Sequence, residues 1–152
     1  MKTLIIIAIT ILATVTFAQA RLGETREQCE RRYGNPLGAD DGLVLYRTAA
    51  FRILISYTDG RAAAIHYSKF EGDKMDANMA ALLIKRNIPQ ESAEWDHKGT
   101  GADGNETGIT TDGKYIYAWG GEDGTLLLAT KEFAVAVKKE EADKRKKATQ
   151  GL

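Results

Sequence analysis

The segment FRILISYTDGRAAAIHY, residues 51–67, contains the strongest structural signal in this chain. Its first half, Phe51 to Thr58, has an apolar or aromatic residue at every second position, which is the period of a β-strand with one buried face. The pair Asp59-Gly60 follows, and an Asp-Gly pair between two apolar runs is typical of a hairpin turn. Residues 62–67 then form the returning strand. The stretch therefore predicts an antiparallel hairpin.

The register of this hairpin depends on the length of its turn. A two-residue turn would pair Tyr57 with Ala62, whereas a three-residue turn with Gly60 as a bulge would pair Tyr57 with Arg61. Only the longer turn gathers the apolar residues of both strands on one face, namely Phe51, Ile53, Ile55, Tyr57, Ala63, Ile65 and Tyr67. We therefore expect the three-residue turn.

A short helix is predicted ahead of the hairpin. Thr25 and Gln28 fit a capping box, in which the hydroxyl and the amide each satisfy a free backbone N–H. Gly34 can take the C-terminal cap, and Pro36 prevents the helix from continuing. One stripe recurs at three- and four-residue spacing: Leu22, Arg26, Cys29 and Tyr33.

Residues 1–20, MKTLIIIAITILATVTFAQA, have the three parts of an export signal. Lys2 is positive, Leu4 to Val15 is apolar, and the segment ends in small residues. The apolar run is short for a bilayer span and lacks a basic flank, so a retained membrane anchor is the less favoured alternative. We expect cleavage following Ala20 and a periplasmic or secreted protein with no stable membrane anchor.

Cys29 is the only cysteine of the chain. A lipid anchor would require cysteine as the first mature residue, a position that Arg21 occupies. A single cysteine cannot form an intramolecular disulfide, which leaves an intermolecular disulfide as one alternative. Because Cys29 falls on the helical stripe, we expect it to be a small buried hydrophobe.

The second half of the chain predicts another helix and more strands. The helix runs from about Lys74 to Asn87 and ends before Pro89. Its inward stripe is predicted to consist of Met75, Met79, Leu82, Leu83 and Arg86. Strands are expected at 43–48, 114–119 and 125–130, with a weaker one at 108–111. Residues 98–108, KGTGADGNETG, predict a mobile glycine-rich loop.

These elements predict an α+β fold, a small antiparallel sheet packed by two helices, with a charged C-terminal helix. Residues 21–137 form a single domain, and residues 138–152 form a charged helical tail. The tail contains KKEEADKRKK and has no apolar stripe. We expect a solvated helix end, with an arm for an anionic partner as the alternative.

An offset of 53 residues relates two turns and two helix stops. Thr58-Asp59-Gly60-Arg61 maps onto Thr111-Asp112-Gly113-Lys114, and Pro36 maps onto Pro89. One interpretation is a tandem helix–hairpin repeat, with copies at 22–70 and 75–130. The other is coincidence, because helix stops and hairpin turns recruit the same residues in unrelated segments.

The charge balance gives no electrostatic argument for nucleic acid. Removal of the signal leaves 132 residues with 20 basic and 21 acidic side chains, a net charge of −1. That length suits one domain, which can bury a core without disulfides.

The opening of the mature chain resembles a family. GETREQCERRYGNP, followed by FRILISYTDGRAAAIHY, looks like the helix–hairpin opening of the small SmpA/OmlA outer-membrane-assembly lipoproteins. It is also similar to one repeat of the beta-lactamase-inhibitor-protein type. The resemblance covers about a third of the chain, and the lipidated first cysteine is missing here. It implies helices on a short antiparallel sheet, protein–protein contact as the mode of action, and no catalytic residues.

Enzymatic motifs are scarce in this sequence. His66 and His97 are the only histidines. We expect His66 to lie half exposed beside Arg52, and His97 follows Asp96 without a nucleophile placed near it. Residues 103–108 imitate the first half of a calcium loop, but a lysine stands where the bidentate glutamate belongs. No catalytic residue, metal site or cofactor is expected.

The sharpest candidate site is KYIYAW. In a strand, Tyr115, Tyr117 and Trp119 point to one face. Exposed, they would form a flat platform for a glycan or an apolar peptide. The alternative, which we favour, is that they belong to the core.

The sequence thus predicts an exported, non-catalytic protein-interaction or inhibitor-like module of the cell envelope. Its partner would be another envelope or secreted protein. The alternative is a small-ligand or glycan-binding domain that uses the aromatic strand face. A hydrolase built on His97 and Asp96 is the weakest hypothesis.

Overall fold

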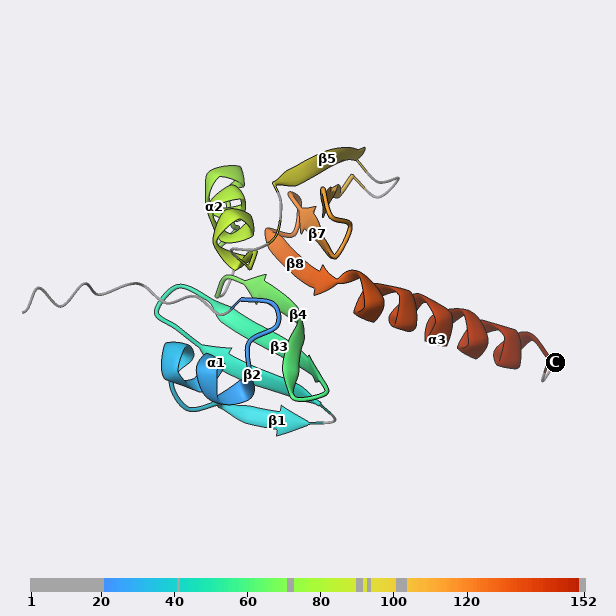
Figure 1. Ribbon diagram of the computed structural model, residues 1–152, viewed down its shortest axis with the longest axis horizontal. Coiled ribbons are helices and arrows are strands. Elements are labelled where there is room, and N and C mark those ends of the chain that lie inside the picture. Colours follow the sequence, from blue (N-terminus) through green and yellow to red (C-terminus); the bar gives the residue numbers. More distant parts are fainter. Residues whose placement is uncertain are drawn as a thin grey trace, which may run out of the picture.

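The computed structural model of the protein describes residues 21–40, 42–70, 73–89, 92, 94–100 and 104–150. Within these residues the chain forms three helices and one eight-stranded antiparallel sheet, in the order β1-β2-β3-β4-β8-β7-β6-β5 (Figure 1). In chain order the elements are α1 (Arg26–Tyr33), β1 (Gly38–Asp40), β2 (Leu43–Arg47), β3 (Arg52–Thr58), β4 (Arg61–Ser68), α2 (Ala77–Asn87), β5 (Trp95–Thr100), β6 (Glu106–Thr110), β7 (Tyr115–Gly120), β8 (Thr125–Thr130) and α3 (Lys131–Gln150). The α+β class agrees with the sequence analysis.

The sheet is larger than the small sheet expected from the sequence. The two edge strands, β1 and β5, were not predicted, and β5 runs into residues 98–100 of the predicted loop. β6 begins at Glu106, so that loop is shorter at both ends, and residues 101–103 lie outside the described part of the chain. Edge strands are held by bonds to one neighbour, and their own sequence needs no regular alternation.

The turn between β3 and β4 has two residues, so the predicted three-residue turn is wrong. Tyr57 pairs with Ala62. Asp59 and Gly60 both have positive φ angles, of 50° and 73°. This is the pattern of a type I′ turn, whose twist matches that of the flanking strands.

A β-bulge inside the hairpin preserves the apolar face in spite of the shorter turn. The register shifts next to Ser56 and Tyr57, where Ala63 is the extra residue of β4. Beyond the bulge, Ile55 pairs with Ile65. The apolar residues therefore lie on one face, as expected. The bulge that brings them there lies within β4, whereas the sequence analysis had placed it in the turn.

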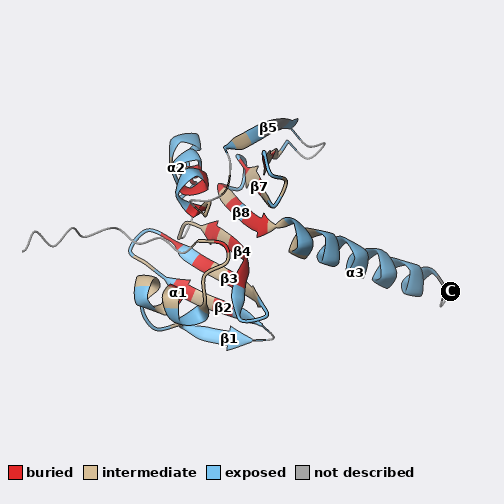
Figure 2. Cartoon of the chain, in the orientation of Figure 1, coloured by how far each residue is buried: buried red, intermediate tan, exposed pale blue. Residues whose placement is uncertain are grey.

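We call the covered side of the sheet the inner face. Two rows of paired residues cross it, Val44–Ile55–Ile65–Leu128–Tyr117 and Tyr46–Ile53–Tyr67–Leu126–Trp119. Residues of both α1 and α2 pack against these rows in one core cluster. Buried positions are concentrated along the central strands and on the sheet-facing side of α2 (Figure 2).

Helix α1 agrees with the sequence analysis. Thr25 is its N-cap, and both halves of the capping box with Gln28 are present. Gly34 caps the other end with a positive φ of 82°. Cys29 is completely buried and unpaired, which confirms that it is a core residue.

Helix α2 is rotated relative to the stripe expected from the sequence. Its buried residues are Ala80, Leu83, Ile84 and Asn87. Leu82 is 37% exposed and Arg86 is also exposed, so their expected inward placement is wrong. Buried Asn87 accepts a hydrogen bond from the hydroxyl of Tyr67 (3.1 Å) and donates to the carbonyl of Leu83 (2.7 Å). This polar contact inside the core orients the helix.

Helix α3 leaves the end of β8 and projects away from the sheet (Figure 1). From Val135 onward its described side chains are exposed (Figure 2). In the described part of the chain, no helix is both long enough and apolar enough to cross a membrane.

Candidate functional site

A groove of about 970 Å³ lies between α2 and the strands β5, β6 and β7. α2 packs against the inner face at β8, and the groove lies between this helix and β5, β6 and β7. Its lining is mostly apolar and includes Leu82, Ile84, Ile88, Trp95 and Tyr117. This volume falls in the upper part of the range of small-molecule pockets.

Tyr117 forms the floor of the groove. Its ring lies over Gly108, where an added Cβ would come within 2.2 Å of the ring. The hydroxyl of Tyr117 donates to a carboxylate oxygen of Glu106 (2.9 Å). Burial, followed by this hydrogen bond, raises the pKa of Tyr117 above its ordinary value, so the phenol stays neutral. Because Gly108 has no side chain, the ring of Tyr117 can pack directly against the backbone of β6.

Trp95 stands edge-on against this floor. Its ring is 5.1 Å from that of Tyr117, with an angle of 81° between the planes, which is a favourable T-shaped contact. Sequence reasoning did not assign Trp95 to a site, because β5 has a loop-like composition and gave no periodic signal.

The three aromatic residues predicted as a site do not form one open platform. Tyr117 is only 4% exposed, as expected for a core residue. Tyr115 and Trp119 are half-buried and pack against the core. Tyr115 lines a second, smaller hollow beside the groove, and the two hollows share Arg21 and Pro89. Only Tyr117 of the predicted set lines the main groove.

Three cations line the groove: Arg21, Lys85 and Arg86. Among the described residues, no acidic group forms a salt bridge with any of them. Two acids, Glu94 and Glu106, also line it, and Glu106 accepts the hydrogen bond from Tyr117. The charge of these lining groups is therefore positive by one.

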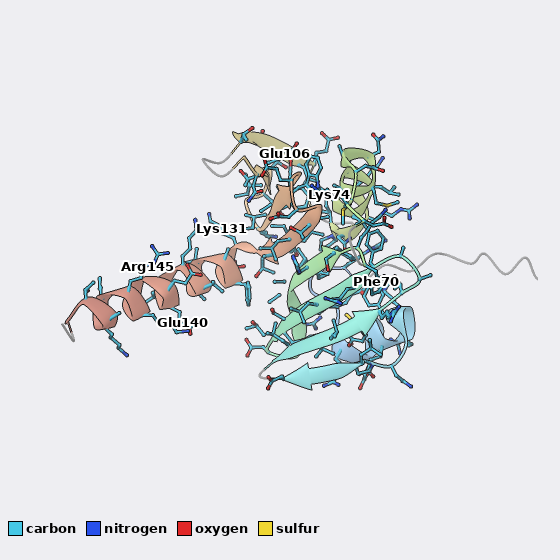
Figure 3. All side chains as sticks on the ribbon, turned by 180° about the vertical axis from the view of Figure 1, so that it is seen from behind. Phe70, Lys74, Glu106, Lys131, Glu140 and Arg145 are labelled. Carbon is cyan, nitrogen blue, oxygen red and sulfur yellow. The ribbon has the colours of Figure 1, made fainter. Side chains whose placement is uncertain are left out.

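The opposite side of the sheet, the outer face, carries a second surface. Its central rows are Leu45–Leu54–His66–Leu127–Ala118 and Ser56–Ala64–Ala129–Ile116–Ile109. In the view from behind, the strands of the first half lie in front of α1 and no described helix crosses them (Figure 3). Leu127, at the centre, is 38% exposed.

One end of the outer face is basic. Arg47 pairs directly with Arg52 across β2 and β3, and the Arg47 guanidinium lies 4.3 Å from the ring centre of Phe70. The cation–π contact offsets part of the repulsion between the two like charges.

Of the two histidines, only His66 has its side chain among the described residues. His66 pairs with Leu54 and Leu127, so its expected place beside Arg52 is wrong. Its half-buried position lowers its pKa. The backbone of His97 lies in β5, and its side chain is outside the described residues, as is Asp103 of the calcium-like loop. Among the described side chains, no group of three or more candidate ligands could hold a metal ion.

A comparison of the chain with family models, with curated proteins and with solved structures finds no match in any of the three. The functional interpretation of the groove and of the outer face therefore rests on their geometry alone.

Proposed function

We propose that the protein is an exported, non-catalytic module of the cell envelope that acts by contact with another envelope or secreted protein. The observation that carries this proposal is the outer face, where no described helix crosses the strands of the first half and where the side chain of Leu127 is 38% exposed. Surfaces of this kind, bordered by polar groups, are typical of protein interaction sites. The basic pair Arg47 and Arg52 favours a partner with an acidic rim.

Two matched leucines test this function. Leu127 on the outer face and Leu82 in the groove are almost equally exposed, at 38% and 37%. The mature chain, immobilised and exposed to envelope extract, should capture a partner that can be identified and purified. Leu127→Gln should weaken binding of that purified partner by about tenfold, because a buried leucine contributes about 1.5–3 kcal/mol. Leu82→Gln should leave it unchanged. No specific capture, or equal losses in both variants, would contradict the proposal.

A second candidate function is ligand binding in the groove. It is supported by the aromatic floor of Tyr117 and Trp95 and by the three cations that line the groove. In this function the ligand binds inside the groove and not on the flat aromatic platform predicted from the sequence. Of the three platform residues, only Tyr117 lines the groove.

We also propose that the chain is a tandem repeat. At an offset of 53 residues, α1 falls on α2, β2 on β5, β3 on β6 and β4 on β7, each within a few residues. One strand pairing is preserved under the offset, because Val44 pairs with Ile55 and His97 pairs with Gly108. Homologous sequences test this origin. If the chain arose by duplication, some homologues should have two halves that share more identical residues than the halves of this chain do. If the match is a coincidence, the halves of homologues should share only the prolines and the turn residues.

A further inference from the structure

We propose that the groove between α2 and β5–β7 binds a single-chain anionic amphiphile, an apolar chain that carries one carboxylate or phosphate group. This inference deepens the second candidate function. It does not depend on the outer face, which lies on the other side of the sheet.

The apolar walls select the chain of the ligand. α2 contributes the exposed side chain of Leu82, the residue after the helix contributes Ile88, and the sheet contributes Trp95 and Tyr117. Leu82 remains 37% exposed in a hollow of about 970 Å³. Filling the hollow with methylene groups would remove this surface from water, at about 0.8 kcal/mol for each buried CH₂.

The polar groups of the groove favour an acyl chain over an extended peptide. An extended peptide must hydrogen-bond its own N–H and C=O groups when it is buried. At the floor, the hydroxyl of Tyr117 is already donated to Glu106. The backbone groups of α2 are bonded within the helix except for the carbonyls of its last turn, which can accept hydrogen bonds but offer no donor to a peptide. A hydrocarbon chain makes no such demand.

The cations select the head group. Lys85 and Arg86 in the last turn of α2, together with Arg21, line the same groove, and their side chains form no salt bridge with a described acid. Two acids, Glu94 and Glu106, also line the groove, and Glu106 accepts the hydrogen bond from Tyr117 at the floor. The chain would thus lie over Tyr117 and Trp95, and its anionic group would meet the cations.

Basic side chains in the last turn also complement the dipole of a helix. If Lys85 and Arg86 only stabilised the helix, the protein should bind anionic and cationic amphiphiles equally well. Titration calorimetry of the mature protein with dodecanoate and with dodecyltrimethylammonium, both below their critical micelle concentrations, separates the two roles. Dodecanoate should bind, and dodecyltrimethylammonium should bind at least about tenfold more weakly.

Three variants locate the site. Lys85→Gln combined with Arg86→Gln should weaken dodecanoate binding by about tenfold and should not weaken binding of the cationic amphiphile. Leu82→Gln should weaken binding of dodecanoate by about tenfold, because it removes apolar lining. Leu127→Gln, the equally exposed leucine of the outer face, should leave dodecanoate binding unchanged.

The proposal is overturned if the native protein gives no heat with dodecanoate, or if both amphiphiles bind equally well. It is also overturned if Leu127→Gln weakens binding as much as Leu82→Gln, or if a capped apolar helical peptide displaces dodecanoate with higher affinity. Loss of partner capture in Leu127→Gln, by contrast, reports only on the outer face. Failure of either function can therefore be recognised without the other.

Discussion

At the scale of single residues, the groove depends on the pairing of a glycine with a tyrosine. Gly108 of β6 lies opposite Tyr117 of β7, and the tyrosine ring occupies the space above the glycine. Tyr117 cannot swing away easily, because its hydroxyl is bonded to Glu106 and its ring contacts Trp95. The floor of the groove is therefore fixed from three sides.

Gly108→Ala should destabilise the protein by about 1–3 kcal/mol, the usual cost of overpacking a filled site. The new methyl group would stand 2.2 Å from a ring carbon of Tyr117 and force the ring out of place. Urea unfolding measures this change in the free energy of unfolding. Gly38→Ala is the matched control, because this strand glycine has open space where its Cβ would be. Equal effects in the two variants would show that the ring contact is not the cause.

At the scale of elements, α3 differs from the other two helices. α1 and α2 contribute buried residues to the core, whereas the side chains of α3 beyond Val137 are exposed as far as Thr149. Glu140 and Lys144, four residues apart, form an ion pair on its surface (2.7 Å). A helix that is polar on all sides receives little stability from packing.

Ending the chain after Val137 should therefore leave the free energy of unfolding within about 0.5 kcal/mol of that of the full mature chain. The helical signal in circular dichroism should fall, while the midpoint of urea unfolding stays in place. A clear loss of stability would mean that the charged end of α3 packs against the domain in solution.

The predicted elements differ in how well local sequence specifies them. The capping box of α1 requires only residues three positions apart, and its prediction is confirmed. The rotation of α2 depends on Asn87 meeting Tyr67, two residues on different elements, and the predicted stripe was wrong. For the same reason, Leu82 was expected in the core although it lines the groove.

At the scale of the whole molecule, hydroxyl groups in the core link both helices to the sheet. Tyr33 of α1 and Tyr67 of β4 share a hydrogen bond of 2.9 Å, and Tyr67 donates in turn to Asn87 of α2. Burial raises the pKa of Tyr67 to about 12 and also raises the pKa of Tyr57 and of the Cys29 thiol. These groups are thus kept in their neutral forms by the fold.

Alkaline pH should therefore unfold the protein. Each of these acids has a higher pKa in the folded state than in the unfolded state, so its contribution is complete below its ordinary pKa of 9.0 or 10.0. The contribution is lost as the pH rises towards about 12, the folded-state pKa of Tyr67. Urea unfolding at successive pH values should show stability falling from about pH 9 upward.

Tyr67→Phe provides the internal comparison for this effect. The variant should be less stable at pH 7, because Asn87 loses a hydrogen-bond partner, but its stability should fall less steeply above pH 9. A stability that stays flat between pH 9 and pH 11 in the native protein would contradict the proposed role of the buried hydroxyl and thiol groups.

The sequence alone determined the features that depend on neighbouring residues. These are the caps of α1, the location of the hairpin at Asp59-Gly60, the apolar face of its strands and the burial of Cys29. Capping, turn chemistry and alternation operate within a few residues, so they can be read along the chain.

Tertiary packing set the bulge that accompanies the two-residue turn, the edge strands β1 and β5, and the rotation of α2. It also brought Trp95, Tyr117 and the cations of α2 to one groove. Each of these features is selected by packing between segments far apart in the sequence, where burial of apolar surface outweighs local preference.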